Sequence, residues 1–352
     1  MKIKLAILER DIAYLNRITA VFSTRYADKL EIYSFTEYEG AMQALDGSRI
    51  DVFLADDFFE VELDRLPGRC GFAYLIDNSG VEMVKDCAAV CRFQKADLIY
   101  KQILNIYSEQ AESMAGFEMN HGDCSCIAFL SPAGGVGCST MAAACARHFA
   151  LRGKRVLYLN LERFGTSDLF FQGEGQFSMS DIIYALKGKR SNLAMKLESC
   201  VKQDACGVKF FSDVNIALDI QELELDEILR LLRTVCQSGL YEYIILDMDF
   251  SIDQKFFEIQ KIIEKMVLVS SGSVMANQKV MKALHALAEA ERSMELPILN
   301  RMVLCYNRFG SKTGRMLEQI PVRNIGGAPV YAQATERQIV EQLSELGIYD
   351  VL

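Results

Sequence analysis

The sequence reads Ile127-Ala128-Phe129-Leu130-Ser131-Pro132-Ala133-Gly134-Gly135-Val136-Gly137-Cys138-Ser139-Thr140, and an alanine-rich segment follows it as far as Ala150. An apolar strand, a glycine-rich turn and the start of a helix come in that order. Glycines let backbone N–H groups turn inward, and the first turn of a helix adds partial positive charge. The hydroxyls of Ser139 and Thr140 suit a phosphate and its magnesium ion. The stretch predicts a phosphate cradle, and the alternative is a glycine turn that only packs a helix on a sheet.

The loop departs from the common phosphate-binding pattern G-x-x-x-x-G-K-[ST] at one position. Cys138 stands where that pattern has lysine. Loss of a charge-assisted contact costs about 1.5–3 kcal/mol, so we expect nucleotide binding to be weakened rather than abolished. Hydrolysis would suffer more, because a lysine aimed at the γ-phosphate stabilises charge that develops in the transition state.

Apolar strands alternate with helical segments on both sides of a polar stretch. The expected strands of the first part are 4–8, 30–35, 52–55, 72–76 and 90–93, and those of the second part are 127–130, 155–160, 208–211, 243–246, 266–270 and 301–306. Uniformly apolar strands separated by helices predict mainly parallel sheets covered on both faces. We therefore predict an α/β chain with a (βα)5 domain at 1–108, a linker at 109–124 and a second domain at 125–352.

Composition narrows the class of protein. The chain has 352 residues, with 47 acidic and 38 basic side chains and a formal net charge of −9. This balance argues against stable binding to nucleic acid or anionic lipid. No apolar run approaches the ~20 residues that span a bilayer, so we expect no direct membrane insertion. Eleven cysteines, an odd number, favour reduced thiols in the cytoplasm.

The order of motifs after the polar stretch resembles the MinD/ParA family of deviant Walker-A ATPases, which have a P-loop fold. The family loop K-G-G-x-G-K-[ST]-T corresponds to residues 133–140. Residues 152–162 match the strand G-x-x-V-L-h-h-D-x-D, residues 241–247 match the Walker-B strand, and residues 302–308 match a late strand that ends in Asn-Arg. The resemblance covers about residues 125–352.

This resemblance implies a site for ATP and Mg2+. The implied nucleotide ligands are Gly134, Gly135, Val136, Gly137, Cys138, Ser139, Thr140, Asn307 and Arg308, and the implied magnesium ligands are Ser139 and, directly or through water, Asp247. In the family the asparagine contacts adenine. Glu162 is the candidate for positioning water, with a solvated charge at the strand end as the alternative.

The departures from the family pattern point to little or no ATP hydrolysis. The first loop lysine, which in the family reaches the partner's nucleotide across a dimer, is Ala133 here, and the second is Cys138. Asn160 replaces an aspartate that the family has near magnesium or water. We therefore expect an ATP-binding protein with weak or absent ATPase activity.

The first domain resembles a response-regulator receiver. Asp56 ends the third expected strand, where a receiver has its phosphate acceptor, and Lys95 follows the fifth, where a receiver has its lysine. Receivers hold magnesium with two acids after the first strand, but this chain reads Glu9-Arg10-Asp11. An arginine in that position disfavours a divalent metal. We therefore expect a pseudo-receiver that is not phosphorylated, with phosphorylation at Asp56 as the alternative.

A pseudo-receiver joined to a MinD/ParA-like domain resembles the TadZ/CpaE family. The resemblance implies a cytoplasmic homodimer that helps to localise and assemble Tad/Flp-type pilus machinery at the cell pole. Its implied partners are the pilus-assembly ATPase and other pilus secretion components. The alternatives are an active MinD/ParA-like partitioning ATPase and a phosphorylation-regulated signalling protein.

Overall fold

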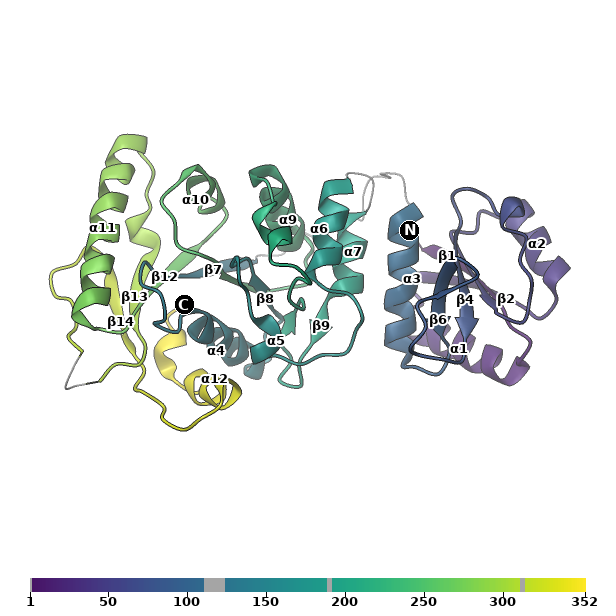
Figure 1. Ribbon diagram of the computed structural model, residues 1–352, viewed down its shortest axis with the longest axis horizontal. Helices are drawn as coiled ribbons and strands as arrows, with labels where there is room; N and C mark the ends of the chain where they lie inside the picture. The colour runs from purple at the N-terminus through teal and green to yellow at the C-terminus, as the bar shows by residue number, and fades with distance from the viewer. Residues whose placement is uncertain (1, 111–123, 189–191, 311–313) are drawn as a thin grey trace. The chain divides into compact units, whose positions relative to one another are not determined.

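The computed structural model describes residues 2–110, 124–188, 192–310 and 314–352 (Figure 1). The chain divides into two compact units. One holds Met1–Glu118 and Tyr184–Cys200, and the other holds Met119–Ile183 and Val201–Leu352. The predicted linker at 109–124 lies almost wholly outside the described residues, so the boundaries at 108 and 125 stay a prediction.

The first unit is built on a six-stranded sheet in the order β2-β1-β3-β4-β6-β5. The strands are β1 (Ile3–Leu8), β2 (Leu30–Phe35), β3 (Val52–Asp56), β4 (Gly71–Ile76), β5 (Met83–Val84) and β6 (Cys87–Cys91). All neighbours pair in parallel except β5 and β6. The parallel strands therefore end at one common edge, where Glu9 and Asp56 lie.

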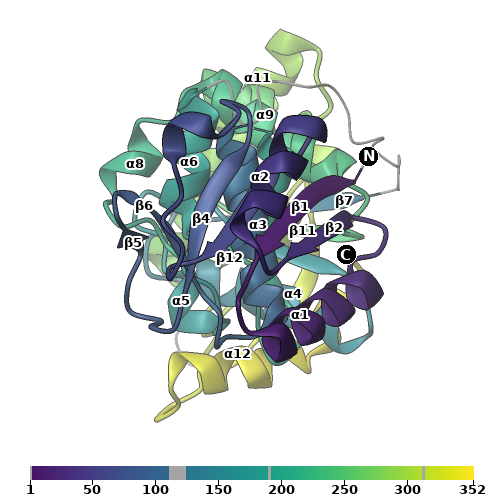
Figure 2. The same cartoon turned by 90° about the vertical axis from the view of Figure 1, so that its right-hand side faces the viewer.

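Three α-helices of this unit cover the two faces of the sheet. They are α1 (Ile12–Arg25), α2 (Tyr38–Gly47) and α3 (Ala96–Gln110). Apolar residues of α1 and α3 share one core cluster with Leu5 and Ile7, whereas α2 shares another with Ala6 and Leu8. Successive residues of β1 thus face opposite layers, and α2 and α3 lie on opposite sides of the sheet (Figures 1 and 2).

Within residues 2–110 the unit has fewer helices than the predicted (βα)5 pattern. Between β3 and β4 the structure has only the short 3-10 turn η1 (Leu63–Arg65), and between β4 and β6 it has the small strand β5. Pro67 and Gly68 in the first connection disfavour an α-helix there. The expected strand at 90–93 is β6, which ends at Cys91, so Arg92 lies in the loop that follows.

Helix α7 (Leu193–Cys200) also belongs to the first unit, far along the chain from the rest of it. Met195 joins the core cluster of α1 and α3, and Glu198 pairs with Lys29. Lys196 is almost fully buried and donates a hydrogen bond to Asn105. This packing of α7 was not predicted from the sequence.

The second unit contains an eight-stranded sheet in the order β14-β13-β12-β7-β11-β8-β10-β9. Its strands are β7 (Ser125–Leu130), β8 (Val156–Asn160), β9 (Lys202–Gln203), β10 (Lys209–Phe210), β11 (Tyr243–Asp247), β12 (Lys265–Ser270), β13 (Met302–Tyr306) and β14 (Arg323–Gly327). All neighbours are parallel except β9 and β10. The six strands expected from sequence are present, and β9 and β14 are additions. Ligands of such sheets bind outside the carboxyl ends of the strands.

Helices flank this sheet, and α4 (Cys138–Leu151) begins directly after the glycine loop (Figure 1). The other helices are α5 (Ser167–Phe170), α8 (Leu218–Gln221), α9 (Leu225–Gln237), α10 (Gln254–Ile259), α11 (Val274–Met294) and α12 (Glu336–Ser344). Helix α6 (Met179–Gly188) begins in this unit, and its part from Tyr184 onward belongs to the first unit. Small side chains let α4 approach the sheet closely, and its residues 140–146 are all buried. Among the residues described, none of the helices combines the length and apolar character needed to cross a bilayer.

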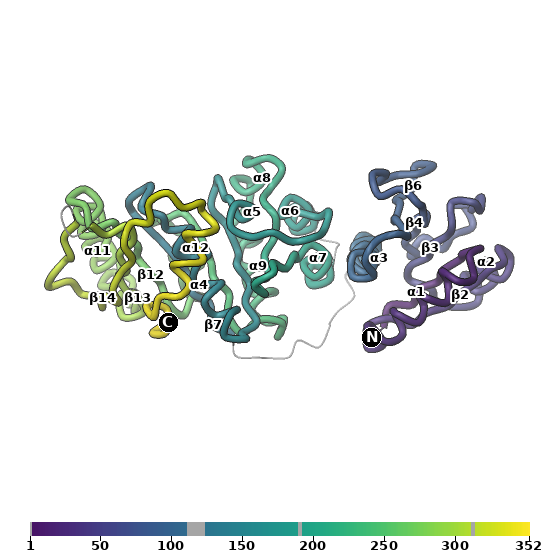
Figure 3. Tube along the Cα trace, turned by 90° about the horizontal axis from the view of Figure 1, so that it is seen from below, coloured from purple at the N-terminus to yellow at the C-terminus, as the bar shows by residue number. Residues whose placement is uncertain are grey.

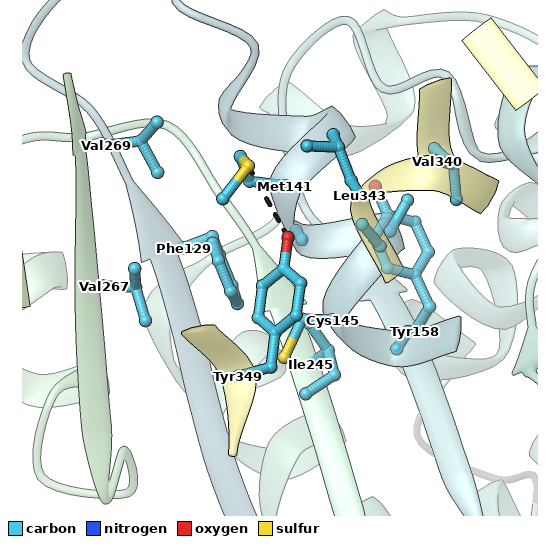
Figure 4. Packing of buried hydrophobic residues seen from close by; sticks show 14 of the residues in the cluster. Phe129, Met141, Cys145, Tyr158, Ile245, Val267, Val269, Val340, Leu343 and Tyr349 are labelled. Carbon is cyan, nitrogen blue, oxygen red and sulfur yellow. Dashed lines mark hydrogen bonds between the residues drawn. The ribbon is translucent and has the colours of Figure 1, made fainter. Parts of the chain in front are cut away.

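The C-terminal segment covers the outer side of α4. Helix α12 packs along α4, and the turn η3 (Gly347–Tyr349) follows it (Figure 3). Tyr349 is buried beside Met141 and Cys145, and its hydroxyl lies 3.5 Å from the sulfur of Met141 (Figure 4). The imidazole of His148, also buried, contacts the carbonyl of Ser344 and the carboxylate of Asp350. These contacts hold the helix that carries the glycine loop.

We expect Tyr349→Ala to lower the free energy of unfolding of the second unit by about 3–5 kcal/mol, because it leaves a cavity against α4. Tyr349→Phe keeps the ring and loses only the contact with sulfur, so it should cost less than about 1.5 kcal/mol. Chemical denaturation of both variants measures the difference. Equal effects of the two substitutions would show that the ring does not hold α4.

Candidate functional site

The glycine loop lies at the carboxyl end of β7 and borders a cleft of about 360 Å³. Gly135 and Gly137 have φ values of 74° and 80°, in the left-handed region that favours glycine. A Cβ atom at Gly137 would also lie 2.4 Å from Nδ2 of Asn307, which is too close for any side chain. Backbone angle and space therefore both require glycine at this position.

Asn307 and Arg308, at the end of β13, reach the loop from the neighbouring part of the sheet. Asn307 is buried, and its Nδ2 donates hydrogen bonds to the carbonyls of Val136 (2.9 Å) and Gly137 (3.3 Å). Arg308 donates from Nη1 to the carbonyl of Gly135 (3.3 Å). The structure thus brings together the two sequence-predicted ends of the nucleotide site. In this state Asn307 binds the loop itself.

The other end of the cleft carries hydroxyl and carboxylate groups. Ser139 donates from Oγ to Oε2 of Glu162 (2.9 Å). Asp247, at the end of β11, is fully buried, and its Oδ2 accepts a hydrogen bond from the hydroxyl of Tyr158 (2.7 Å). Among the described residues nothing donates a hydrogen bond to Oδ1 of Asp247. An unpaired buried carboxylate oxygen near a serine hydroxyl fits the oxygen ligands that Mg2+ prefers.

Burial dominates the electrostatics of this end. It raises the pKa of Asp247 to about 8, and the nearby charge of Glu162 acts in the same direction. Burial also raises the pKa of Glu162, against the hydrogen bond from Ser139. Without a cation, the pair therefore retains a proton near neutral pH. A divalent cation would stabilise both carboxylates in their charged form.

Asn160 and Cys138 stand at two of the positions where the sequence departs from the pattern that it resembles. Oδ1 of Asn160 accepts a hydrogen bond from the backbone N–H of Glu162 (2.8 Å), which shapes the turn after β8. Burial raises the pKa of the Cys138 thiol well above its usual value, so this side chain is neutral. Among the described residues that line the cleft, Arg308 is the only cation, whereas Glu162, Asp249 and Glu336 are acidic.

The acids of the first unit meet an arginine that sequence reasoning missed. Arg92 is buried and donates from Nη1 to both carboxylate oxygens of Glu9 (3.1 and 2.9 Å) and from Nη2 to Oδ1 of Asp56 (3.1 Å). Arg10 is exposed, and its Nε lies 3.1 Å from Oδ2 of Asp56. Asp11 caps α1 by accepting hydrogen bonds from two backbone N–H groups.

Residues 1–108 match the sequence model of a family described as "TadZ-like, receiver domain". The first unit contains a TadZ-like receiver domain. A search of curated proteins finds no match to the chain.

Solved structures account for the rest of the fold. A ParA family ATPase from Chlorobium tepidum TLS is 21% identical over 65% of this chain and 98% of that chain, with a TM-score of 0.51. A chain of the MinC:MinD cell division protein complex of Aquifex aeolicus is 17% identical over 62% of this chain and 86% of that chain, with a TM-score of 0.47. MinD complexed with Mg-ADP from Pyrococcus horikoshii OT3 is 16% identical over 63% and 95%, with a TM-score of 0.46. The second unit thus has the fold of the ParA family ATPase.

Of the four site residues predicted in the TadZ-like receiver domain, two lie together and two lie elsewhere. Glu9 and Asp56 lie in one pocket, as the resemblance to receivers implies, whereas Asp11 serves as a helix cap. Lys95 lies at the start of α3, where its carbonyl accepts hydrogen bonds from the backbone of Leu98 and Ile99. Asp56 contacts the guanidinium groups of Arg92, which is buried, and Arg10, which is exposed. A basic residue directly after a buried strand was the available signal.

We expect the stability of the ligand-free protein to depend on the proton of Asp247. The pKa of Asp247 is raised to about 8 in the folded protein, whereas an aspartate in an unfolded chain has a pKa of about 3.9. The folded state binds more protons between these values, so the free energy of unfolding falls as pH rises through them. Asp247→Asn keeps an acceptor for Tyr158 and removes this loss. The melting temperature of Asp247→Asn minus that of the wild type is the quantity to compare at the two pH values. We expect this difference to be larger at pH 8.5 than at pH 5.5, by at least about 2–4 °C.

Thermal unfolding without magnesium or nucleotide measures this difference. Asp226→Asn, at an exposed position of α9, is the matched control. A shift of Asp247→Asn that is the same at both pH values would contradict the prediction.

Proposed function

We propose that this chain is an ATP-binding localisation and assembly factor of the TadZ/CpaE type, with little or no ATP hydrolysis. One observation carries the proposal. The chain joins a TadZ-like receiver domain to a cleft bordered by a glycine loop at the start of a helix, and none of the described residues that line this cleft is a lysine. Such a site suits a nucleotide that acts as a structural or switching ligand rather than as a rapidly consumed substrate.

The residues of the cleft divide the work of holding Mg-ATP. Backbone N–H groups of residues 134–140 and the start of α4 would hold the phosphates. Arg308 would supply the positive charge that Cys138 lacks. Ser139 and Asp247 would hold Mg2+, directly or through water, and the unpaired Oδ1 of Asp247 supports this assignment. The magnesium ion would supply charge neutralisation for the phosphates.

We expect weak hydrolysis because the two loop positions where the resembled family has lysines are uncharged here. Neither Ala133 nor Cys138 can stabilise charge that develops on the γ-phosphate. Asn160 is engaged with the backbone of Glu162, and Glu162 accepts a hydrogen bond from Ser139. Glu162 would have to leave that bond before it could position water.

Calorimetric titration of the full chain with Mg-ATP tests the nucleotide site. We expect binding at millimolar concentration or tighter, and about tenfold weaker binding for Arg308→Ala because a charge-assisted contact is lost. Arg233→Ala removes an exposed arginine of α9 and is the matched control, with unchanged affinity. No heat of binding at millimolar Mg-ATP would end the proposal.

A lysine placed in the loop should restore the missing charge. We expect Cys138→Lys to tighten ATP binding by about tenfold or more, the magnitude of one charge-assisted contact. The wild type should turn over ATP more slowly than ~1 s⁻¹, the lower end of ordinary enzyme rates. Affinity measurements and phosphate release assays check both. Turnover at an ordinary enzyme rate would favour a partitioning ATPase instead.

The TadZ-like receiver domain supports a role in Tad/Flp-type pilus biogenesis. We place the chain in the cytoplasm, at the cell pole, with the pilus-assembly ATPase and other secretion components as its partners. The receiver would act as a docking module without phosphorylation at Asp56. Binding between this chain and the purified pilus-assembly ATPase of the same cell is the direct test.

We also propose a homodimer formed through the second unit. Position 133 is an alanine, so no lysine there would offset the repulsion between the phosphates of two facing ATP molecules. Dimerisation would then depend on contacts between side chains. Such contacts sense ATP against ADP only weakly. Sedimentation should show a dimer with ATP, with ADP and without nucleotide. A monomer that becomes a dimer with ATP alone would contradict this expectation.

A further inference from the structure

Loops from four parallel strands meet around the guanidinium of Arg92. The sheet order places β1, β3, β4 and β6 side by side, so their carboxyl ends lie at one edge. Glu9 follows β1, Asp56 ends β3 and Arg92 follows β6. Asp57 and Asp77 complete the acidic group, with oxygens 3.7 Å from Nη2 and 2.7 Å from Nε of Arg92.

The centre of this group is closed to water. Glu9 and Asp56 have side chains that are 0% exposed, and that of Arg92 is only 7% exposed. Two buried carboxylates are costly unless a cation and hydrogen bonds compensate them. Arg92 provides both, because it contacts the two carboxylates with separate nitrogens. Although burial acts to raise the pKa of Asp56, hydrogen bonds from the backbone of Phe58 and from Arg92 lower it.

A receiver-type magnesium ion does not fit this pocket as it stands. A divalent cation would need the oxygens of Glu9 and Asp56, and both accept hydrogen bonds from Arg92. A guanidinium is bulky and always charged, so it cannot share the position with a metal ion. Glu9 and Asp56 are thus arranged as in a cation site, but the cation between them is the side chain of Arg92.

We propose that the carboxylate pocket of the TadZ-like receiver domain is a divalent-cation site that Arg92 fills permanently. The loops after β1, β3 and β6 are then tied together without a metal ion. A metal ion can leave, but Arg92 is covalently attached, so the pocket has one state at every magnesium concentration. This inference does not depend on the nucleotide site of the second unit.

Removal of Arg92 should uncover the site, because Arg10, which also contacts Asp56, is exposed and can turn toward solvent. We expect Arg92→Ala in the full chain to bind about one more Mn2+ per chain than the wild type, measured by calorimetric titration. The double variant Arg92→Ala/Asp56→Asn should lose this additional ion. Any magnesium site in the second unit is the same in all three proteins, so the difference reports the receiver pocket alone. Asp56→Asn in the wild-type background should leave Mn2+ binding unchanged.

Amide hydrogen exchange in peptides from β3 and β6 gives a second readout. This measurement also detects any partial unfolding of the variant. Exchange in Arg92→Ala should be faster than in the wild type, and Mn2+ at ten times its dissociation constant should slow it by about tenfold. Arg92→Gln, which retains hydrogen-bond donors without charge, should respond in the same direction. Arg25→Ala, which breaks an exposed ion pair with Asp97, is the control and should not respond to Mn2+.

Three outcomes would overturn the proposal. In the first, neither Arg92→Ala nor Arg92→Gln binds an additional manganese ion, and the hydrogen exchange of both variants is independent of Mn2+. The additional ion could persist in the double variant, which would place it elsewhere. Asp56→Asn could remove a manganese ion from the wild type, which would show that Arg92 does not fill the pocket.

Discussion

The parallel pairing of β7 with β11 and β12 governs where every candidate residue of the second unit lies. Ala128 lies opposite Leu246 in β11 and Met266 in β12, so these strands end at the same level. The glycine loop and Asp247 consequently leave the sheet at one edge. Asn160 in β8 is level with Asp247, and Asn307 follows β13 at the same edge. A cleft with a glycine loop at one end and carboxylates at the other is the geometric result.

Charge distinguishes this cleft from one built for rapid phosphoryl transfer. Its acidic end has buried carboxylates that retain a proton, and its loop has one arginine at the rim instead of lysines within. The first unit differs, because a buried arginine lies among its acids and offsets part of their charge. The two units thus differ in where a cation stands, because the cleft has its arginine at the rim whereas the receiver domain has one buried among the acids.

The sequence predicted the sheets and the loop well because apolar strands and glycine patterns are local. The resemblance to the MinD/ParA family implied that Asn307 and Arg308 contact a nucleotide, and the structure shows both bonded to carbonyls of the glycine loop. The roles of Arg92 and Asn160 were not predictable, because each depends on which loops meet at a sheet edge. The same holds for α7, whose packing in the first unit depends on partners far away in sequence, such as Lys29 and Asn105.

Asn307 has a consequence for the mobility of the glycine loop. Its Nδ2 donates to the carbonyls of Val136 and Gly137, and its Oδ1 accepts a hydrogen bond from the backbone N–H of Arg308 (2.9 Å). The N–H donors of the amide are therefore engaged within the protein, whereas Oδ1 keeps a second lone pair. Nδ2 can turn to a ligand of the cleft only by giving up a bond to the glycine loop. A ligand that uses this donor would loosen the loop, and a ligand that leaves the donor in place would find the loop already rigid.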